Sequence, residues 1–268
     1  MTLLLDLLRA TLPSDYSIDG ELKAGGEGSV FRGKYKNQPA AIKVFKPQSD
    51  PRRREREINC LQKIDCPTLV RVLAAENVML QGIDHTVVAY EFHSGGDLTG
   101  MLSLSSPIDS DTLLNLAEDI CQAIDMLWSH RIVHRDIKPA NIVRTQNGGF
   151  VLVDVGLARH IDRSNITAPG LAPGTSGYMS PEQAMGRRAL TIKSDIFSLG
   201  ITLYEIAASE HPFRWQQHLI GVTSPSPLQS RRNDLPPLLV KLIHDMMNTR
   251  PAQRPTNLSE RIENIRSA

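Results

Sequence analysis

Residues 194–208 form the segment that most constrains the fold of this chain. Their sequence, SDIFSLGITLYEIAA, is apolar nearly all the way round a helix, which is typical of a helix buried at the centre of a domain. Two further helices are predicted, over residues 110–130 and 238–247. In the first of these, Asp109 and Asp111 are candidate caps, and apolar side chains recur at helical spacing at Leu113, Leu116, Ala117, Ile120, Ile124 and Leu127. The C-terminal part of the chain is therefore expected to be mainly helical.

The pattern is different before residue 93. Residues 40–45 and 86–92 are short β-rich runs, and residues 51–64 between them predict a helix. Residues 93–96 (HSGG) then break the pattern as a hinge or turn would. We therefore predict an α+β fold in one domain over residues 1–268. It has a small sheet-rich lobe with one helix over residues 1–92, a hinge over 93–96 and a larger, mainly helical lobe over 97–268.

Charge and cysteine content narrow the function classes. The formal net charge is +1, whereas a nucleic-acid-binding domain usually carries a basic excess, so no nucleic acid is expected as a partner. The basic run at residues 52–54 is interpreted as a solvated helix start rather than a phosphate-backbone patch. The cysteines Cys60, Cys66 and Cys121 are odd in number and lack C-x-x-C spacing, so neither zinc nor a disulfide framework is expected. A reducing compartment, the cytoplasm, is the expected location.

Leucines cluster at the N-terminus, at positions 3, 4, 5, 7 and 8. No basic region precedes them, Asp6 and Arg9 interrupt them, and the run is far shorter than the roughly 20 residues of a membrane-spanning helix. No other stretch reaches about 18 apolar residues, so no membrane span is expected. The leucines are expected to form a short helix that packs on the domain or, alternatively, on a partner.

Two features of the small lobe could bind phosphate. Residues 23–30 (KAGGEGSV) are either an ordinary glycine-rich hairpin turn or a loop whose backbone N–H groups approach phosphate oxygens closely. Period-two alternation puts Lys43 on the strand face opposite Ile42 and Val44, together with Ala41. That lysine could equally lie on an exposed strand.

Residues 134–141 (HRDIKPAN) carry the strongest chemical signal. Asp136, Lys138 and Asn141 lie close together in non-helical sequence, so one segment can present a carboxylate, an ammonium and an amide oxygen at a single point. Downstream, the predicted buried strand FVLV runs into Asp154. An acidic residue there is either a plain turn residue or a hard oxygen ligand for Mg²⁺.

Residues 174–182 (GTSGYMSPE) and 194–200 (SDIFSLG) complete a set of motifs whose order and spacing resemble the eukaryotic-type Ser/Thr protein kinase superfamily. The resemblance extends from the Gly-rich loop near residue 25 to Arg254, and the wording MSPEQ at 179–183 is similar to bacterial members. It implies the bilobal protein-kinase fold, with a small antiparallel-sheet lobe and a larger helical lobe. It also implies ATP and Mg²⁺ as cofactors and protein Ser/Thr hydroxyls as substrates.

The resemblance also implies a nucleotide site. Within it, Lys43 matches the strand lysine on the α- and β-phosphates, and Glu57 matches the helix carboxylate that pairs with this lysine. The remaining nucleotide contacts that the resemblance implies are Gly25, Gly26, Gly28, Val30, Ala41, Glu91, His93, Asn141 and Asp154.

The catalytic roles follow from the same resemblance. Asp136 corresponds to the base that accepts the substrate hydroxyl proton, and Lys138 to the lysine that supports the transferring phosphate. Asn141 and Asp154 match the two metal-holding positions. Three further matches are structural: Asp195, which would orient the loop backbone, and Glu182 with Arg254, which would form a buried ion pair.

Four residues depart from the family pattern: Lys23 at the usual first glycine, Glu27 at the loop tip, Tyr90 at the gatekeeper position and Val155 in place of the usual Phe. The first two are expected to alter loop geometry and nucleotide affinity. Tyr90 should close the pocket behind the adenine, and Val155 should weaken a packing column by about 1–3 kcal/mol. None of the four removes a charged participant, so catalysis is expected to survive.

Arg135 directly precedes Asp136. In similar kinases, an arginine before the catalytic aspartate accompanies control by activation-loop phosphorylation. A phosphate on that loop would carry nearly two negative charges and could pair with Arg135. The candidate sites are Ser164, Thr167, Thr175 and Ser176. We favour Thr167, because Thr175 matches the position that contacts Lys138, and we expect autophosphorylation. Alternatively, these are ordinary loop hydroxyls.

Two other functions share this fold. A pseudokinase scaffold would be expected to lose Lys43, Asp136 or Asp154, and all three are present. A small-molecule phosphotransferase would lack the segment over residues 175–182, which shapes a polypeptide site in the protein kinases. The sequence leaves the oligomeric state open.

Overall fold

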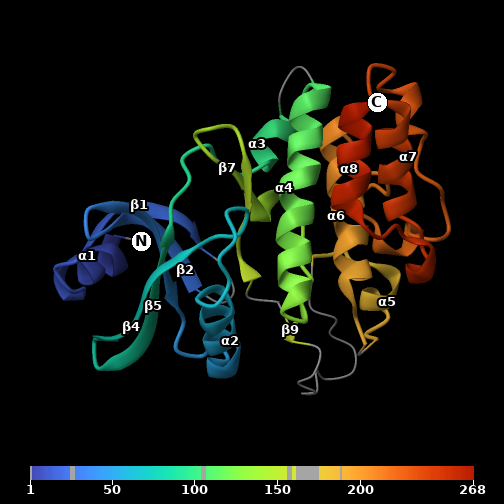
Figure 1. Cartoon of the computed structure of the whole chain (residues 1–268). Helices are drawn as coiled ribbons and strands as arrows, with labels where there is room; N and C mark the ends of the chain where they lie inside the picture. Colours follow the sequence, from blue (N-terminus) through green and yellow to red (C-terminus); the bar gives the residue numbers. More distant parts are fainter. Residues whose placement is uncertain (1, 25–27, 104–106, 156–158, 161–174, 188) are drawn as a thin grey trace. The chain divides into compact units, whose positions relative to one another are not determined.

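The computed structural model describes residues 2–24, 28–103, 107–155, 159–160, 175–187 and 189–268. It contains two compact units, Met1–Asp65 with Leu69–His93 and Cys66–Thr68 with Ser94–Ala268. Residues 66–68 belong with the second unit, where the Thr68 carbonyl accepts a hydrogen bond from the Leu152 N–H at 2.9 Å. The first unit is built on a sheet and the second is mainly helical (Figure 1), so the predicted α+β architecture is confirmed.

The sheet of the first unit has five antiparallel strands in the order β1-β2-β3-β5-β4. Tight hairpins at residues 36–37 and 81–82 connect β2 to β3 and β4 to β5, and every residue in these two turns has a positive φ. Two successive positive φ angles are what a type I′ turn requires, so the turns themselves set the pairing of these strands. The strands are β1 (Tyr16–Ala24), β2 (Gly28–Tyr35), β3 (Gln38–Phe45), β4 (Val72–Leu80) and β5 (Ile83–Glu91).

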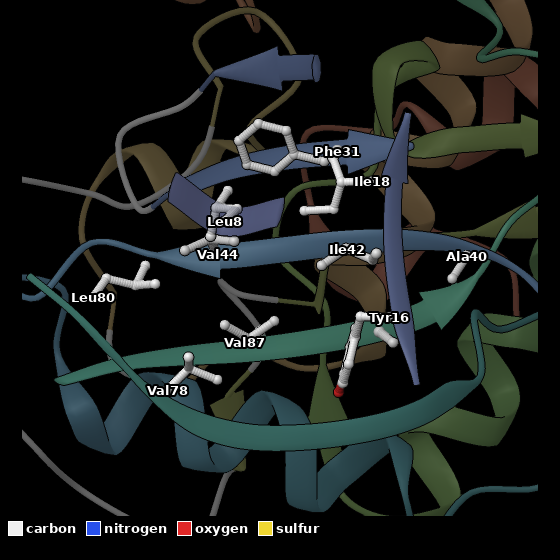
Figure 2. Packing of buried hydrophobic residues seen from close by; sticks show 11 residues of the cluster. Leu8, Tyr16, Ile18, Phe31, Ala40, Ile42, Val44, Val78, Leu80 and Val87 are labelled. Atoms are coloured by element: carbon white, nitrogen blue, oxygen red, sulfur yellow. The ribbon is translucent and has the colours of Figure 1, made fainter. Parts of the chain in front are cut away.

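Helix α1 (Thr2–Thr11) packs on one face of this sheet. Its Leu8 is fully buried in an apolar cluster to which all five strands contribute, including Ile18, Phe31 and Ile42 (Figure 2). The Arg9 guanidinium adds hydrogen bonds to the carbonyls of Ile18 and Asp19, at 3.0 and 2.9 Å. Leu5, Leu7 and Leu8 therefore pack on the domain, which was one of the two alternatives that the sequence left open, whereas the side chains of Leu3 and Leu4 lie outside the described residues.

Helix α2 (Pro51–Leu61) begins after Asp50, whose side chain accepts the Arg52 N–H at 3.0 Å. The helix ends three residues before the predicted boundary. The Arg54 guanidinium donates to the hydroxyl and the carbonyl of Ser49, at 2.8 and 3.0 Å, and the side chain of Arg52 is exposed. Arg52 and Arg54 therefore lie at the helix start as interpreted, with Arg52 exposed and Arg54 partly buried, and the Arg53 side chain lies outside the described residues.

Helix α6 (Ile192–Ala208) of the second unit is buried along nearly its whole length, as predicted. It contacts α4 (Ser110–Ser129) and α7 (Pro237–Met246). At Gly200 a Cβ atom would lie only 2.8 Å from the Cβ of Met246, so a glycine is needed for the close approach of α6 and α7. Asp109 caps α4 as predicted, because its side chain accepts the Thr112 N–H at 2.8 Å.

Shorter elements complete the second unit. Strand β6 pairs with β9, and β7 pairs with β8. None of the helices among the described residues combines the length and the apolar character that crossing a membrane would require. The elements are α3 (Thr99–Leu102), β6 (Ile132–Val133), β7 (Ile142–Arg144), β8 (Phe150–Leu152), β9 (Arg159–His160), α5 (Pro181–Ala184) and α8 (Leu258–Ser267).

Replacing Leu8 by alanine should destabilise the first unit, because it opens a cavity between α1 and the sheet. The expected loss in the free energy of unfolding is about 2–5 kcal/mol. The matched control is Leu22→Ala on β1, where the side chain is 48% exposed and the expected loss is less than about 1 kcal/mol. Urea unfolding of both variants measures the difference, and equal losses would contradict the packing of α1 on the sheet.

Candidate active site

The loop between β6 and β7 gathers polar side chains around the carboxylate of Asp136. One of its oxygens, Oδ2, accepts hydrogen bonds from Lys138 Nζ at 2.8 Å and Asn141 Nδ2 at 3.0 Å. The other, Oδ1, accepts the N–H and the hydroxyl of Thr175 at 3.1 and 2.7 Å. The Thr175 hydroxyl in turn accepts a hydrogen bond from Lys138, as the sequence predicted. Residues distant in sequence therefore meet at one carboxylate.

Asp195, in the first turn of α6, holds the backbone of this loop. Its carboxylate accepts the N–H groups of His134 and Arg135, each at 2.8 Å. Burial raises the pKa of Asp195, and these hydrogen bonds oppose that effect by stabilising the ionised form. The Gln183 side chain also donates to the Arg135 carbonyl at 2.7 Å. The predicted orienting role of Asp195 is confirmed.

Asn141 and Asp154 lie at neighbouring points of the β7–β8 hairpin. The Val153 N–H donates to the Asn141 carbonyl at 2.9 Å, and Asp154 follows directly. Because the Asn141 amide nitrogen donates to Asp136, its Oδ1 is the amide atom suited to a cation. The Asp154 residue is exposed and has a φ of 63°. An amide oxygen and a carboxylate fit Mg²⁺, which takes one or two protein ligands and completes its shell with phosphate oxygens and water.

Three nucleotide-site candidates of the first unit share the sheet face opposite the apolar cluster. Val30 on β2 pairs directly with Lys43 on β3, and Ala41 lies two residues along the same strand. The Lys43 residue is only 8% exposed, and its Nζ lies 4.5 Å from the centroid of the Phe45 ring. Burial at this level excludes the alternative of a surface lysine on an exposed strand.

The remaining candidates of the first unit are described in part. Gly28 faces β3 so closely that a Cβ atom would lie 2.3 Å from the Val44 carbonyl oxygen, so the sheet alone accounts for this glycine. Glu91 ends β5 and His93 follows it, half-buried, with a pKa lowered by burial. Glu57 lies in α2, but its side chain, and the whole of Gly25 and Gly26, lie outside the described residues.

Glu182 and Arg254 form the predicted buried ion pair. The guanidinium donates to both carboxylate oxygens, at 2.6 and 2.8 Å, and lies 4.8 Å from the Phe197 ring centroid. The Ser194 hydroxyl adds a third hydrogen bond, at 2.8 Å. Burial alone would raise the pKa of Glu182, but the bonds from Arg254 outweigh it and hold the pKa below its usual range.

The segment after Thr175 is anchored by contacts that the sequence did not predict. The Tyr178 hydroxyl donates to the buried Glu205 carboxylate at 2.5 Å. The Gln217 side chain accepts the Gly177 N–H at 3.1 Å and donates to the Met179 carbonyl at 2.8 Å. The signal that could have found Glu205 is a single carboxylate inside the mostly apolar stretch 196–208.

His211 is the buried centre of this region. The backbone N–H groups of Phe213 and Trp215 both donate to its Nδ1, at 3.1 and 2.9 Å. Its ring contacts those of Tyr178 and Trp215, and each of the two ring centroids lies 5.3 Å from that of the imidazole. Burial lowers the pKa of His211 to about 4, so the imidazole is neutral at pH 7.

The residues that depart from the family pattern are placed as follows. Tyr90 and Val155 are buried, whereas Lys23 is exposed and Glu27 lies outside the described residues. Among the phosphorylation candidates, Ser164 and the favoured Thr167 also lie outside the described residues, and Ser176 is exposed.

Arg254→Met should be strongly destabilising, because it leaves the Glu182 carboxylate buried without its partner. We expect a loss of about 3–5 kcal/mol in the free energy of unfolding at pH 7. The matched control is Arg266→Met, which removes an ion pair with Glu118 that is partly exposed on both sides and is expected to cost less than about 1 kcal/mol. Chemical unfolding of both variants measures these losses. A loss of less than about 1 kcal/mol for Arg254→Met would show that the ion pair between Glu182 and Arg254 contributes little to stability.

His211→Asn should make stability less sensitive to acid, since asparagine keeps a hydrogen-bond acceptor and removes the titration. In the wild type, the unfolded state binds a proton near pH 6.5 and the folded state only near pH 4. The stabilising contribution is therefore present above pH 6.5 and is lost as the pH falls toward 4. Between pH 7 and 4.5 the wild type should lose about 2 kcal/mol more than the variant in urea unfolding. Parallel pH profiles would mean that the folded protein protonates His211 normally.

The sequence matches the protein kinase domain family over residues 16–265. It is also similar to curated bacterial proteins. The serine/threonine-protein kinase PknA of Mycobacterium tuberculosis is 29% identical over 257 residues, which cover 91% of this chain and 59% of the relative. PknA of Corynebacterium glutamicum is 31% identical over 217 residues, 78% of this chain and 46% of the relative.

A third relative is the probable serine/threonine-protein kinase PknB of Lactococcus lactis, 29% identical over 206 residues that cover 74% of this chain and 32% of the relative. The chain thus spans between 32% and 59% of the length of these three relatives. The family match, in contrast, extends over most of the chain and includes both units. The chain therefore belongs to the protein kinase family.

Proposed function

We propose that this chain is a Ser/Thr protein kinase that transfers the γ-phosphoryl group of Mg-ATP to protein Ser/Thr hydroxyls. The observation that carries the proposal is the group of Lys138, Asn141 and Thr175 around the Asp136 carboxylate. Phosphoryl transfer depends on positioning and charge neutralisation more than on covalent help from the protein. A fixed carboxylate with an ammonium beside it supplies both.

In the proposed step, the substrate hydroxyl oxygen attacks the γ-phosphorus and the bond from that phosphorus to the β–γ bridging oxygen breaks. Asp136 accepts the hydroxyl proton as the new bond forms. The Lys138 ammonium, 2.8 Å from Asp136, stabilises negative charge on the transferring group. Thr175 fixes the side chains of Asp136 and Lys138 relative to each other, because its hydroxyl forms a hydrogen bond with both.

The proposed nucleotide contacts come from both units. Lys43 would bind the α- and β-phosphates and pair with Glu57. Gly25, Gly26, Gly28, Val30, Ala41, Glu91 and His93 would surround the rest of the nucleotide. Asn141 and Asp154 would hold Mg²⁺, which neutralises phosphate charge when bound. The burial of Lys43 and its direct pairing with Val30, on the sheet face that also carries Ala41, support this assignment.

The pseudokinase alternative is disfavoured by the residues themselves. Lys43, Asp136 and Asp154 are all present, and Asp136 already has the hydrogen bonds that a catalytic carboxylate needs. A small-molecule phosphotransferase is disfavoured by the ordered segment from Thr175 to Glu182, which is tied to Asp136 at one end and to Arg254 at the other. The proposal includes a cytoplasmic location, a single kinase domain over residues 1–268 and autophosphorylation, with Thr167 as the favoured site.

Transfer of labelled γ-phosphate from ATP to a generic protein substrate tests the proposal. Asp136→Asn and Asp154→Ala should each reduce incorporation by about 10²-fold or more, because one removes the proton acceptor and the other a metal ligand. Asp84→Asn, at an exposed position of β5, is the matched control and should retain wild-type activity. Equal incorporation by all variants would mean that the activity comes from a contaminant.

The same incubations, measured by intact mass, test autophosphorylation. The wild type should gain 1 or more phosphates, and Asp136→Asn should gain none. A wild-type mass that stays unchanged after incubation with Mg-ATP would contradict autophosphorylation.

A further inference from the structure

Trp215 is unusual in both its backbone and its exposure. It has a φ of 56° and follows Arg214 with a φ of 51°, so two successive bulky residues adopt the left-handed conformation. Its residue exposure is 57%, although large aromatic residues are usually buried. Strained backbone of this kind persists only where the surroundings enforce it, and it is enriched at ligand-binding sites.

The surroundings of Trp215 do enforce this conformation. Its N–H donates to the buried His211, whose ring lies beside the indole. The Gly177 backbone, with a φ of 95°, approaches so closely that a Cβ there would lie 3.1 Å from the Trp215 Cα. The Gln217 side chain bonds the backbone of Gly177 and Met179 from the same turn. Trp215 is thus fixed to the segment that begins at Thr175.

This attachment limits the distance from Trp215 to Thr175, which contacts the proposed catalytic carboxylate. Gly177 is two residues from Thr175, which is at most about 7 Å of chain. Adding the close approach at Gly177 puts the Trp215 Cα within about 12 Å of the Thr175 Cα. Thr175 itself contacts Asp136. An extended peptide advances about 3.3 Å per residue, so about four residues cover this distance.

We propose that Trp215 selects protein substrates by contacting a large apolar side chain within about four residues of the phosphorylated Ser or Thr. The inference rests on the proposed function and adds a substrate preference to it. An exposed, immobilised indole gains most from covering apolar surface, and it loses little side-chain freedom when it binds. The adjacent exposed Arg214 disfavours a basic side chain at the same place.

A peptide array tests this preference. Each peptide has one Ser and a single Leu, Lys or Ser at one of the four positions on either side. For the wild type, kcat/KM should be about tenfold higher with Leu than with Ser at one position, through a lower KM. Trp215→Ala should reduce this ratio to about twofold or less, and Trp215→Phe should restore most of it. The KM for Mg-ATP should stay unchanged.

Leu238→Ala, which removes an exposed apolar side chain from α7, is the matched control and should keep the wild-type preference. An unchanged preference in Trp215→Ala, or a preference for Lys that Trp215→Ala abolishes, would overturn the inference and leave the kinase assignment intact. Absence of transfer to every peptide would instead contradict the proposed function.

Fluorescence tests the contact without catalysis and without altering Trp215. The chain has two tryptophans, so Trp128→Phe leaves Trp215 as the only one. Titration with a peptide that has Leu around its Ser should shift the emission to shorter wavelength, because the indole loses contact with water. The same peptide with Gln in place of Leu should cause no shift. No shift with the leucine peptide, at concentrations where it competes as a substrate, would show that Trp215 does not contact it.

Discussion

The loop that carries Asp136 has almost no regular structure, and one buried carboxylate determines its path. Asp195 accepts the N–H groups of His134 and Arg135, and Arg135 adopts a left-handed φ of 75° that costs a non-glycine residue about 1–2 kcal/mol. The first turn of a helix stabilises a negative charge, so α6 opposes the effect of burial on the Asp195 carboxylate. The central helix of the second unit thus also positions the loop that carries Asp136.

The anchored loop also allows Asp136 to accept a hydrogen bond from Thr175, which lies 39 residues further along the sequence. Thr175 begins a segment whose other end is tied to α6 by Tyr178 and Glu205, and to Arg254 by Glu182. Each of these bonds involves a buried side chain that would be costly to leave without a partner. The proposed catalytic group and the proposed polypeptide-binding segment are therefore supported by one connected network of polar contacts.

Much of this arrangement could be predicted from the sequence, because the signals were local. The apolar periodicity of residues 110–130 and 194–208 placed α4 and α6 to within two residues, and the spacing of Asp136, Lys138 and Asn141 indicated one shared site. Contacts that depend on tertiary packing gave no local pattern. Nothing in the sequence around His211 indicates that its ring would contact those of both Tyr178 and Trp215. Nor could the sequence show that Gly28 is required by the nearby Val44 carbonyl, whatever the loop binds.

We propose that side chains from both units act on one nucleotide. A crystal structure with Mg²⁺ and a non-hydrolysable ATP analogue tests it most directly. We expect one nucleotide whose α- and β-phosphates contact Lys43, with a metal ion held by Asn141 and Asp154 and the γ-phosphate facing Asp136. A nucleotide bound elsewhere, or one that contacts Lys43 while Asp154 and Asn141 face away from its phosphates, would show that the two units do not share a nucleotide in this way.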